Sequence, residues 1–447
     1  MKQKKIINMT EGRITPSLIA FALPLVAGSI FQQLYNTADM MFVGNLVGKT
    51  AAAAVGASGT LVTCLIGLFT GIATGTGVAI AQAAGAQDKE AAQKLLHSAA
   101  AFSVAAGILL TLVGEVAAQP ILRLLNTPDA IMADAVSYIR LYFLGMFPMI
   151  LYNVGAGVLR ACGDSQTPFR ILAVGGFLNV AVDALMIGAL HLEVEGAAIA
   201  TTISQTFSAV AVVIALMRGN DFLRLRFGQI RFHGASLKKI LHFGLPAGIQ
   251  SMLITLSNIV LQYFINGYGE DAVAAFSTYF RLESFAYLPV LAFGQAATTF
   301  AGQNLGAGQY DRIRKGTLTA SAVSMLSVAA IAFTLLGLGP VAIGWFVKDE
   351  QVSRIGMQII TVSFPFYWLN SLIEVLGGTI RGIGRSLTSM IIVLISLGGC
   401  RLVIAWLIEN HLHSIRALSA VYPITWTIAV ILYLVVLVRY FRSMGRS

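Results

Sequence analysis

Long apolar runs, separated by short polar or Gly/Pro-containing segments, recur along the whole chain. About 20 apolar residues, at ~1.5 Å of rise each, are enough for a helix to cross a bilayer. The pattern predicts twelve such helices, near residues 15–43, 52–82, 92–118, 130–157, 168–190, 196–217, 238–265, 273–301, 314–338, 352–379, 387–409 and 416–438. We therefore expect an all-α integral membrane protein.

The first span is repeated later in the chain. Pro24 and Asn36 are matched by Pro246 and Asn258, at an offset of 222 residues. Further matches at an offset of 221 residues occur within residues 51–54, 82–86 and 160–165, just before the fifth span. Pro24 and Pro246 lie inside apolar helices, where a proline can bend the helix, so we treat them as candidate hinges.

The repeat predicts the domain organisation. The most basic and least apolar connection, residues 218–239, falls where the pattern begins again. We expect two six-helix lobes, residues 1–217 and 240–447, joined by this segment as a cytoplasmic linker. Because each half holds an even number of spans, the lobes should be related by a pseudo-twofold axis along the membrane normal.

Composition and charge agree with a membrane protein. The chain is 57% hydrophobic and 11% charged, against ~25% charged residues in soluble domains. Its net charge of +10 does not indicate nucleic-acid binding, since the basic residues lie in short segments between apolar runs. With the N-terminus inside, 22 Lys and Arg residues fall on the cytoplasmic side and 6 on the other. The positive-inside rule then places both termini in the cytoplasm of a multi-pass plasma-membrane protein.

Several classes of chemistry have no signal in this sequence. The three cysteines are widely spaced and indicate neither a disulfide framework nor a metal site. Phosphate-binding loops and nucleophile elbows are also missing from the sequence. We therefore expect a monomer with no enzyme activity, no cofactor and no nucleic-acid partner. The sequence also shows no ATPase motif, so any uphill transport would have to draw on an ion gradient.

Two acids stand out within the apolar spans of the first half. An ionised carboxylate at membrane depth costs at least ~2.5 kcal/mol. Gln32, Asn36 and Asp39 share one helix face, and the repeat position of Asp39 is Leu261. Asp183 lies four residues after Asn179, on the same face of the fifth span.

Asp39 and Asp183 each lie 15 residues after a proline, in the outer third of their spans, so their carboxylates could approach each other. Together with amide neighbours, two such acids can hold a proton or supply oxygen ligands to a desolvated Na⁺. The alternative is that Asp39 caps a helix end and Asp183 accepts structural hydrogen bonds.

The chain resembles a known family over essentially its whole length. The segments that carry the resemblance include FALPLVAGSIFQQLYNTADMMFVGNLVG, AIAQAAGAQD, VLRACGDSQTP, HFGLPAGIQ and GTIRGIGRS. They resemble the bacterial branch of the multidrug and toxic compound extrusion (MATE) family. The resemblance implies a twelve-helix antiporter that exports cationic or amphipathic drugs in exchange for protons or sodium.

The resemblance also implies which residues bind the coupling ion. The family's positions correspond to Asp39, Asn153, Asn179, Asp183, and Thr201 or Thr202, and Asn36 is adjacent on the first helix. Some members bind a cation in the second lobe, but here the seventh helix has no acid and Asn370 stands near the expected acid of the tenth. We therefore expect the proton as coupling ion, with Na⁺ at Asp39 and Asp183 as the alternative.

The second half contains its own buried charges. Arg281, Glu283 and Arg401 lie near mid-membrane, and they either neutralise each other or leave Glu283 to attract a cationic substrate. Glu374 occupies the repeat position of Asn153 and could line the same cavity. The remaining residues that we expect in the substrate cavity are Gln32, Tyr35, Met252, Asn258 and Phe280. Each of these side chains could instead serve ordinary packing.

A rival function within transport is a flippase or exporter of a lipid-linked or polysaccharide precursor. Such a protein should line its cavity with basic residues that meet phosphates. Almost all the basic residues here lie in predicted loops, which favours the antiporter.

Overall fold

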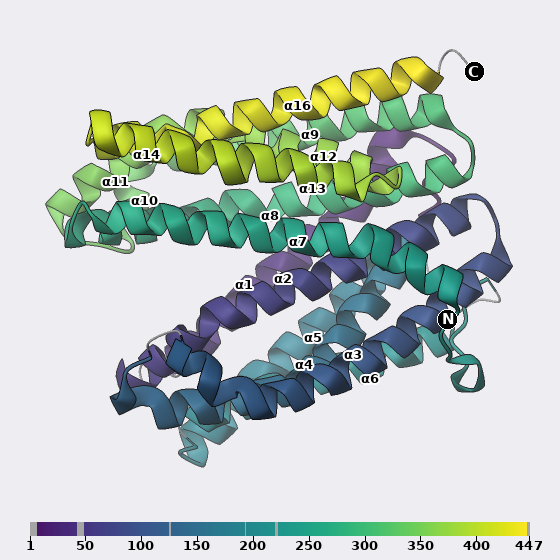
Figure 1. Ribbon diagram of the computed structural model, residues 1–447, viewed down its shortest axis with the longest axis horizontal. Helices are drawn as coiled ribbons and strands as arrows, with labels where there is room; N and C mark the ends of the chain where they lie inside the picture. The colour runs from purple at the N-terminus through teal and green to yellow at the C-terminus, as the bar shows by residue number, and fades with distance from the viewer. Residues whose placement is uncertain (1–6, 43–48, 125–126, 193, 220–221, 445–447) are drawn as a thin grey trace. The chain divides into compact units, whose positions relative to one another are not determined.

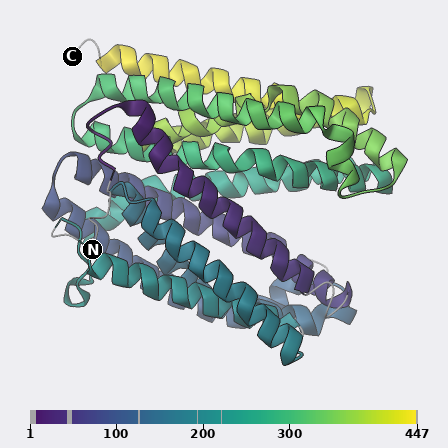
Figure 2. The same ribbon diagram turned by 180° about the vertical axis from the view of Figure 1, so that it is seen from behind.

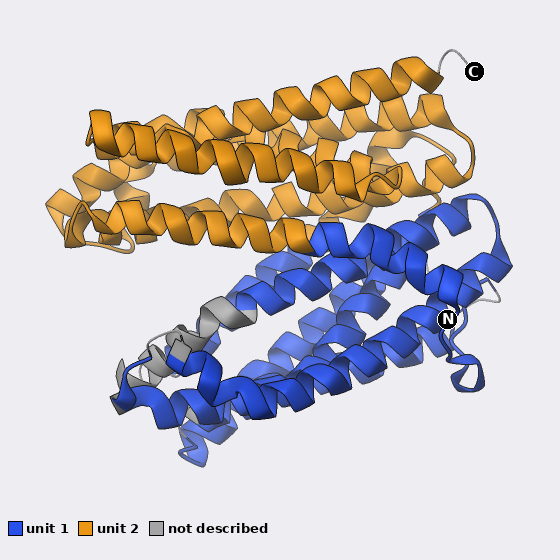
Figure 3. Ribbon diagram, viewed as in Figure 1, with its two compact units in different colours: residues 1–7, 27–248 blue, residues 8–26, 249–447 orange. Residues whose placement is uncertain are grey.

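The computed structural model describes residues 7–42, 49–124, 127–192, 194–219 and 222–444, which form helices joined by short turns (Figure 1). No strand occurs in these ranges, so the predicted all-α class is confirmed. The chain divides into two compact units: unit 1 comprises residues 1–7 and 27–248, and unit 2 comprises residues 8–26 and 249–447 (Figure 3).

Ten described helices are long and apolar enough to cross a membrane, and an eleventh span consists of two helices that meet at a bend of 46°. The twelfth, α8 (Glu270–Gly306), has 37 residues, but polar side chains such as Arg281, Glu283 and Gln295 make it less apolar. The described helices thus account for the twelve predicted spans.

Unit 1 is built from the first six spans and the start of the seventh. Its elements are most of α1 (Ile14–Phe42), α2 (Lys49–Gly85), α3 (Lys89–Leu124), α4 (Asp129–Ala161), α5 (Gln166–Asp183) with a π-helical turn Ala184–Ala189, α6 (Val194–Met217), a 3₁₀ turn Phe227–Gln229 and the first half of α7 (Gly234–Asn266). Helix α4 packs against α2, α3 and α6 and so forms the centre of this unit.

The small residues of α2 allow a very close helix contact. A Cβ atom added to Gly71 would lie 2.1 Å from the backbone nitrogen of Gly248, and one added to Gly75 would lie 2.2 Å from that of Gly244. Backbones approach this closely only where neither helix carries a side chain. The glycines of residues 71 and 75 therefore allow the close packing of α2 against the first half of α7.

Unit 2 repeats the helical pattern with more interruptions. After the second half of α7 and α8 come α9 (Tyr310–Gly337), α10 (Gly339–Gly344), α11 (Glu350–Ser363), a 3₁₀ turn Phe364–Phe366, α12 (Trp368–Gly382), α13 (Ser386–Val393), a π-helical turn Leu394–Cys400, α14 (Arg401–His411), α15 (Ile415–Ser419) and α16 (Val421–Met444). Pro365 lies in the turn between α11 and α12, where the 46° bend occurs. A proline cannot continue the helical hydrogen bonding there.

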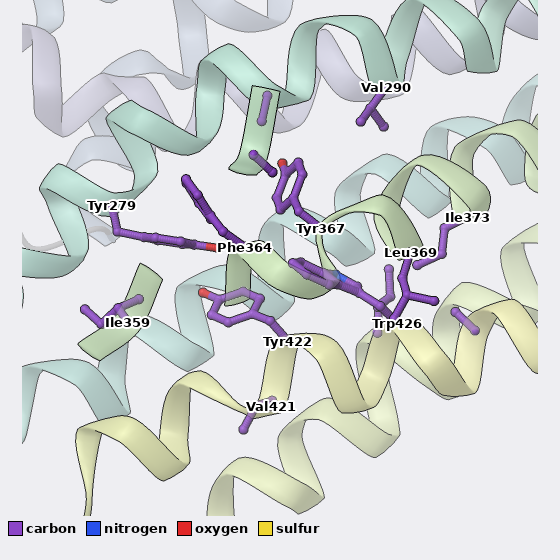
Figure 4. Packing of buried hydrophobic residues seen from close by; sticks show 14 of the residues in the cluster. Tyr279, Val290, Ile359, Phe364, Tyr367, Leu369, Ile373, Val421, Tyr422 and Trp426 are labelled. Atoms are coloured by element: carbon purple, nitrogen blue, oxygen red, sulfur yellow. The ribbon is translucent and has the colours of Figure 1, made fainter. Parts of the chain in front are cut away.

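Aromatic side chains form much of the core of unit 2 (Figure 4). Tyr279 of α8, Tyr367 beside α12, and Tyr422 and Trp426 of α16 pack together with Phe364. The ring of Tyr367 meets that of Trp426 edge-on, with 5.4 Å between centroids. Such edge-to-face pairs add ~0.5–1.5 kcal/mol beyond the area that they bury. This packing fixes the helices that surround the cavity described below.

Helix α1 runs from Ile14 to Phe42 with Pro24 inside it, and Figure 2 shows α1 as one purple helix. The packing units divide the chain within α1 and α7, whereas the sequence repeat divides it between helices. The difference arises because a long helix meets different neighbours along its length. The segment before α1 is held by unit 2, where Arg312 donates from Nε to the carbonyl oxygen of Met9 at 3.1 Å and from Nη2 to that of Glu11 at 2.7 Å.

Candidate functional site

The structure brings the two acids of the first half together in unit 1. Asp39 lies near the end of α1 and is half-buried, whereas Asp183 is the last residue of α5 and is fully buried. The two carboxylates are close enough to interact electrostatically. Helix α1 can run along α5 because the ring of Tyr35 lies over Gly176, where a Cβ atom would be 2.8 Å from Cδ1 of Tyr35.

The oxygen atoms of this acid pair are short of partners. Both carboxylate oxygens of Asp183, Oδ1 of Asp39 and Oδ1 of Asn179 are buried and have no hydrogen-bond partner among the described residues. Buried polar atoms are normally satisfied, and leaving one without a partner costs ~1–3 kcal/mol. Four such oxygens in one place indicate a site built for something other than the protein itself.

Two tyrosines that the sequence reasoning did not select lie beside the acids. Tyr138 and Tyr142 stand four residues apart on α4, with their ring centroids 6.0 Å apart. Both lie in the neighbourhood of Asp39, and Tyr138 also lies near Asp183. The i, i+4 spacing on the predicted span 130–157 placed them on one helix face, which was the available signal.

Two of the other residues expected at the ion site, Asn153 and Thr202, make hydrogen bonds with backbone carbonyls. Asn153 donates from Nδ2 to the carbonyl oxygen of Met149 on its own helix at 2.9 Å. Thr202 donates to the carbonyl oxygen of Leu141 at 3.2 Å and so links α6 to α4. Thr201 is half-buried on α6. The assignment of these three side chains as ion ligands stays a prediction.

The polar face of α1 follows the predicted stripe. Gln32 and Asn36 are exposed, and Tyr35 between them is half-buried and interacts with Gln32. Phe31 of α1 packs against Phe177 of α5, with 5.8 Å between the two ring centroids. The apolar side of α1 therefore holds α5 while its polar side stays accessible.

The oxygen donors of the acid pair fit either of two ions. Carboxylate and amide oxygens are suitable ligands for a hard cation, and two facing carboxylates can also share a proton. No group of three or more His, Cys, Asp or Glu side chains in the described residues is arranged to hold a metal ion.

Unit 2 contains a separate cavity of about 280 Å³. Four of the predicted cavity residues line it, namely Asn258, Phe280, Glu283 and Glu374. The remaining lining consists of Ile254, Ser284, Tyr287, Asn370, Ile373, Leu397, Arg401, Tyr422 and Trp426. Met252 is half-buried on α7 and is not among the described lining residues. Tyr422 and Trp426 were not selected from the sequence, although they share one face of the last span.

Each of the two acids in this cavity has a defined partner. Glu374 forms an ion pair with Arg381, with 3.1 Å between Oε2 and Nη2. Oε1 of Glu283 accepts a hydrogen bond from the hydroxyl of Tyr367 at 3.1 Å. Arg281 is exposed and lies over the ring of Phe346, 5.9 Å from its centroid. Among the described residues no basic group lies within 4.0 Å of the Glu283 carboxylate, so the direct charge cluster considered from the sequence does not form.

Arg401 is a buried cation at the cavity wall. Arg401 is the first residue of α14 and is 3% exposed. Its Nη1 donates a hydrogen bond to Oδ1 of Asn258 at 3.1 Å. Its guanidinium lies over the ring of Tyr422, with 5.3 Å from Cζ to the centroid. The repeat-related asparagines thus differ, because Asn36 is exposed on α1 whereas Asn258 holds an arginine.

Comparison with known proteins gives consistent results. A family model described as MatE matches residues 24–185 and 246–407. The chain is 26% identical to "Probable multidrug resistance protein YoeA" of Bacillus subtilis (strain 168), over 93% of this chain and 92% of that protein. It is 29% identical to "Probable multidrug resistance protein YpnP" of the same organism, over 88% of each. A solved structure described as the outward-facing conformation of a multidrug resistance MATE family transporter covers 100% of both chains, with a TM-score of 0.93 and 22% identity.

Proposed function

Because this chain belongs to the MatE family, we propose that it is a secondary antiporter that exports cationic or amphipathic organic compounds, with the proton as coupling ion. The two relatives named above are both described as probable multidrug resistance proteins, which supports a multidrug substrate range. The twelve-span architecture is that of a multi-pass membrane protein. Sodium is the other candidate for the coupling ion.

The observation that carries this proposal is the set of partnerless oxygens on Asp39, Asn179 and Asp183. Binding an ion there gives these buried oxygens the partner that the described residues do not supply, so it is energetically favourable. Protonating one carboxylate relieves the repulsion between Asp39 and Asp183 and lets α1 bend near Pro24. If that bend closes the substrate surface, ion and substrate exclude each other, and this exclusion is antiport by thermodynamic linkage.

The choice of proton over sodium rests on the composition of the second lobe and on this acid pair. Helix α7 contains no Asp or Glu, so a second-lobe cation site with an acid from this helix is excluded. Two carboxylates at close range in an apolar lobe readily share one proton. Carboxylate, amide and hydroxyl oxygens at ~2.4 Å are nevertheless adequate sodium ligands, and the experiment must separate the two ions.

The acid pair is tested by conservative substitutions. We expect Asp39→Asn and Asp183→Asn each to abolish ion-driven export of ethidium from energised vesicles, because an amide keeps the shape but cannot bind and release the charge. Asp311→Asn is the matched control, since Asp311 is exposed in the first turn of α9. Export at the wild-type rate in either acid variant, at equal membrane abundance, would show that this carboxylate has only a structural role.

The ion is identified in proteoliposomes. We expect an imposed pH gradient to drive ethidium export in sodium-free buffer. If export is absent there and a sodium gradient at constant pH restores it, the coupling ion is sodium. If neither gradient drives export, ion coupling itself is refuted.

The orientation of the protein is also part of the proposal. We place both termini and residues 218–239 in the cytoplasm, following the distribution of basic residues. A Ser236→Cys variant in a background without Cys64, Cys162 and Cys400 should react with an impermeant thiol reagent only after the cells are opened. Labelling from outside intact cells would show that the segment lies on the external side and would refute this topology.

A further inference from the structure

A separate cleft lies in unit 1, at the end where helices α4 and α6 begin. It has a volume of about 450 Å³, and residues of α3, α4 and α6 line it. Helices α3 and α6 both pack against α4 (Figure 1). The polar part of the lining is Glu115, Ser137, Arg140 and Glu195, and the apolar part includes Leu144 and Ile199. These residues are distinct from the acid pair and from the lining of the cavity in unit 2.

The polar and apolar residues of the cleft lie at different depths. Helices α4 and α6 both enter the membrane from this end, so the residues with lower numbers lie nearer the membrane surface. On α4, Ser137 and Arg140 precede Leu144. On α6, Glu195 precedes Ile199. A polar end at the surface and an apolar end below it match a phospholipid, whose headgroup lies above its acyl chains.

The charged residues lie at the depth of the lipid headgroups. Arg140 and Arg160 enclose the predominantly apolar part of α4 and are 20 residues apart, or ~30 Å of helix, the thickness of the hydrocarbon core. Glu195 likewise precedes the apolar part of α6. Below the charged level, Leu112 of α3 is 61% exposed and Ile203 of α6 is 38% exposed. Apolar side chains exposed at this depth contact acyl chains.

The charges of the cleft match a ligand that carries both signs. Two carboxylates and one guanidinium in the lining give a net charge of −1. Nε of Arg140 is 3.8 Å from Oε2 of Glu115, and the two side chains are 48% and 40% exposed. Such an exposed pair is weak, so the guanidinium remains accessible to an anion. Glu195 is exposed and accepts a hydrogen bond from the hydroxyl of Ser137, which holds its carboxylate beside α4.

We propose that this cleft binds an aminophospholipid, with the phosphate at Arg140 and the primary ammonium at Glu195 and Glu115. A guanidinium is suited to phosphate oxygens. A primary ammonium donates N–H bonds to carboxylates, which a trimethylammonium group cannot do. Phosphatidylethanolamine therefore fits better than phosphatidylcholine, and the excess negative charge disfavours the anionic phosphatidylglycerol. The orientation proposed above places the site in the outer leaflet, but the headgroup preference depends neither on that orientation nor on antiport.

Native mass spectrometry of the purified full chain measures the headgroup preference. Phosphatidylethanolamine, phosphatidylcholine and phosphatidylglycerol with identical acyl chains are titrated separately into the detergent-solubilised protein, and the Kd of the first bound lipid is determined. We expect phosphatidylethanolamine to bind about threefold to tenfold more tightly than either of the other two lipids, because only its headgroup donates N–H bonds to the carboxylates without adding net negative charge.

Two variants locate the headgroup in the cleft. Glu195→Gln should remove most of the preference for phosphatidylethanolamine over phosphatidylcholine, because it removes a partner of the ammonium and leaves the phosphate contact. Arg140→Gln should weaken the binding of both lipids by a similar factor of about threefold or more, because both carry the phosphate. Arg354→Gln is the matched control. Arg354 is exposed on α11, its Nη2 is 3.7 Å from Oε1 of Glu350, and it does not line the cleft.

Three results would overturn the proposal. The first is equal wild-type affinity for phosphatidylethanolamine and phosphatidylcholine, or tighter binding of phosphatidylglycerol. The second is a loss of lipid binding in Arg354→Gln as large as that in Arg140→Gln, which would mean that the loss reflects overall charge. The third is displacement of the lipid by an equal concentration of phosphoethanolamine, the soluble headgroup, which would show that the acyl chains contribute nothing. Unchanged binding in Arg354→Gln, together with the expected losses in the two cleft variants, would support the site.

Discussion

Substituting Gly71 by alanine should disrupt the close contact between α2 and the first half of α7 in unit 1. The added Cβ atom would lie 2.1 Å from the nitrogen and 2.2 Å from the Cα atom of Gly248. Non-bonded heavy atoms are at their optimum near 3.5–4.0 Å. Since both atoms belong to backbone, no rotamer change relieves the overlap, and α2 and α7 must move apart locally by more than ~1 Å.

The magnitude follows from two opposing effects. Replacing glycine by alanine inside a helix stabilises it by ~1 kcal/mol, whereas overpacking of this kind costs ~1–3 kcal/mol. Gly77→Ala on the same helix is the matched control, because its Cβ atom would lie 3.4 Å from the carbonyl oxygen of Gly157, an ordinary contact. The propensity gain is common to both variants, so Gly71→Ala should be less stable than Gly77→Ala by about 1–3 kcal/mol.

The assay must report on unit 1, and the tryptophans do not, since all four lie in the second half of the chain. Thermal unfolding followed by a thiol-reactive dye is suitable in a Cys400→Ala background, where Cys64 and Cys162 are the remaining thiols. We expect the Tm to fall in Gly71→Ala and to stay or rise in Gly77→Ala. Equal Tm values, or a higher Tm for Gly71→Ala, would refute the packing argument.

Two further predictions concern polar contacts outside the candidate sites. Arg312→Lys should speed hydrogen exchange over residues 8–13 by about tenfold, because a lysine is a point donor that cannot reach three backbone carbonyls at once; unchanged exchange would show that the arginine does not hold this segment. Loss of hydration and the nearby Arg231 lower the pKa of His233, which contacts Ser98. Its neutral form is therefore favoured in the folded loop, and the loop should lose stability as the pH falls below the ordinary value of 6.5. Amide hydrogen exchange in residues 218–239, corrected for the intrinsic exchange rate at each pH, should rise at acidic pH in the wild type but not in His233→Gln. The same pH dependence in both proteins would contradict this account.

The twelve spans and the acid pair could be predicted from the sequence because their signals are local. Apolar runs of spanning length and a proline at the same place in each repeat need no knowledge of neighbours. The expected approach of Asp39 and Asp183 followed from similar depth in two helices, and the structure brings the two acids together. Their assignment as ion ligands remains a prediction.

Contacts between helices could not be predicted from the local pattern of apolar and polar residues. The spacing of Tyr138 and Tyr142 showed that they share a face of α4, but not that this face is directed toward Asp39. Likewise, the bend of 46° at the turn that contains Pro365 depends on how α11 and α12 pack. Helix rotation about its own axis is determined by packing, which a single sequence does not display.

What the sequence alone determined is therefore the membrane class, the repeat, the spans and the presence of costly acids at membrane depth, because each follows from the free energy of placing one segment in a bilayer. Tertiary structure alone decided which polar groups are satisfied. Arg401 received an amide from α7 and no carboxylate within 4.0 Å among the described residues. The physical reason is that satisfaction of a buried charge depends on atoms 3–4 Å away in space, contributed here by a residue 143 positions distant in the chain.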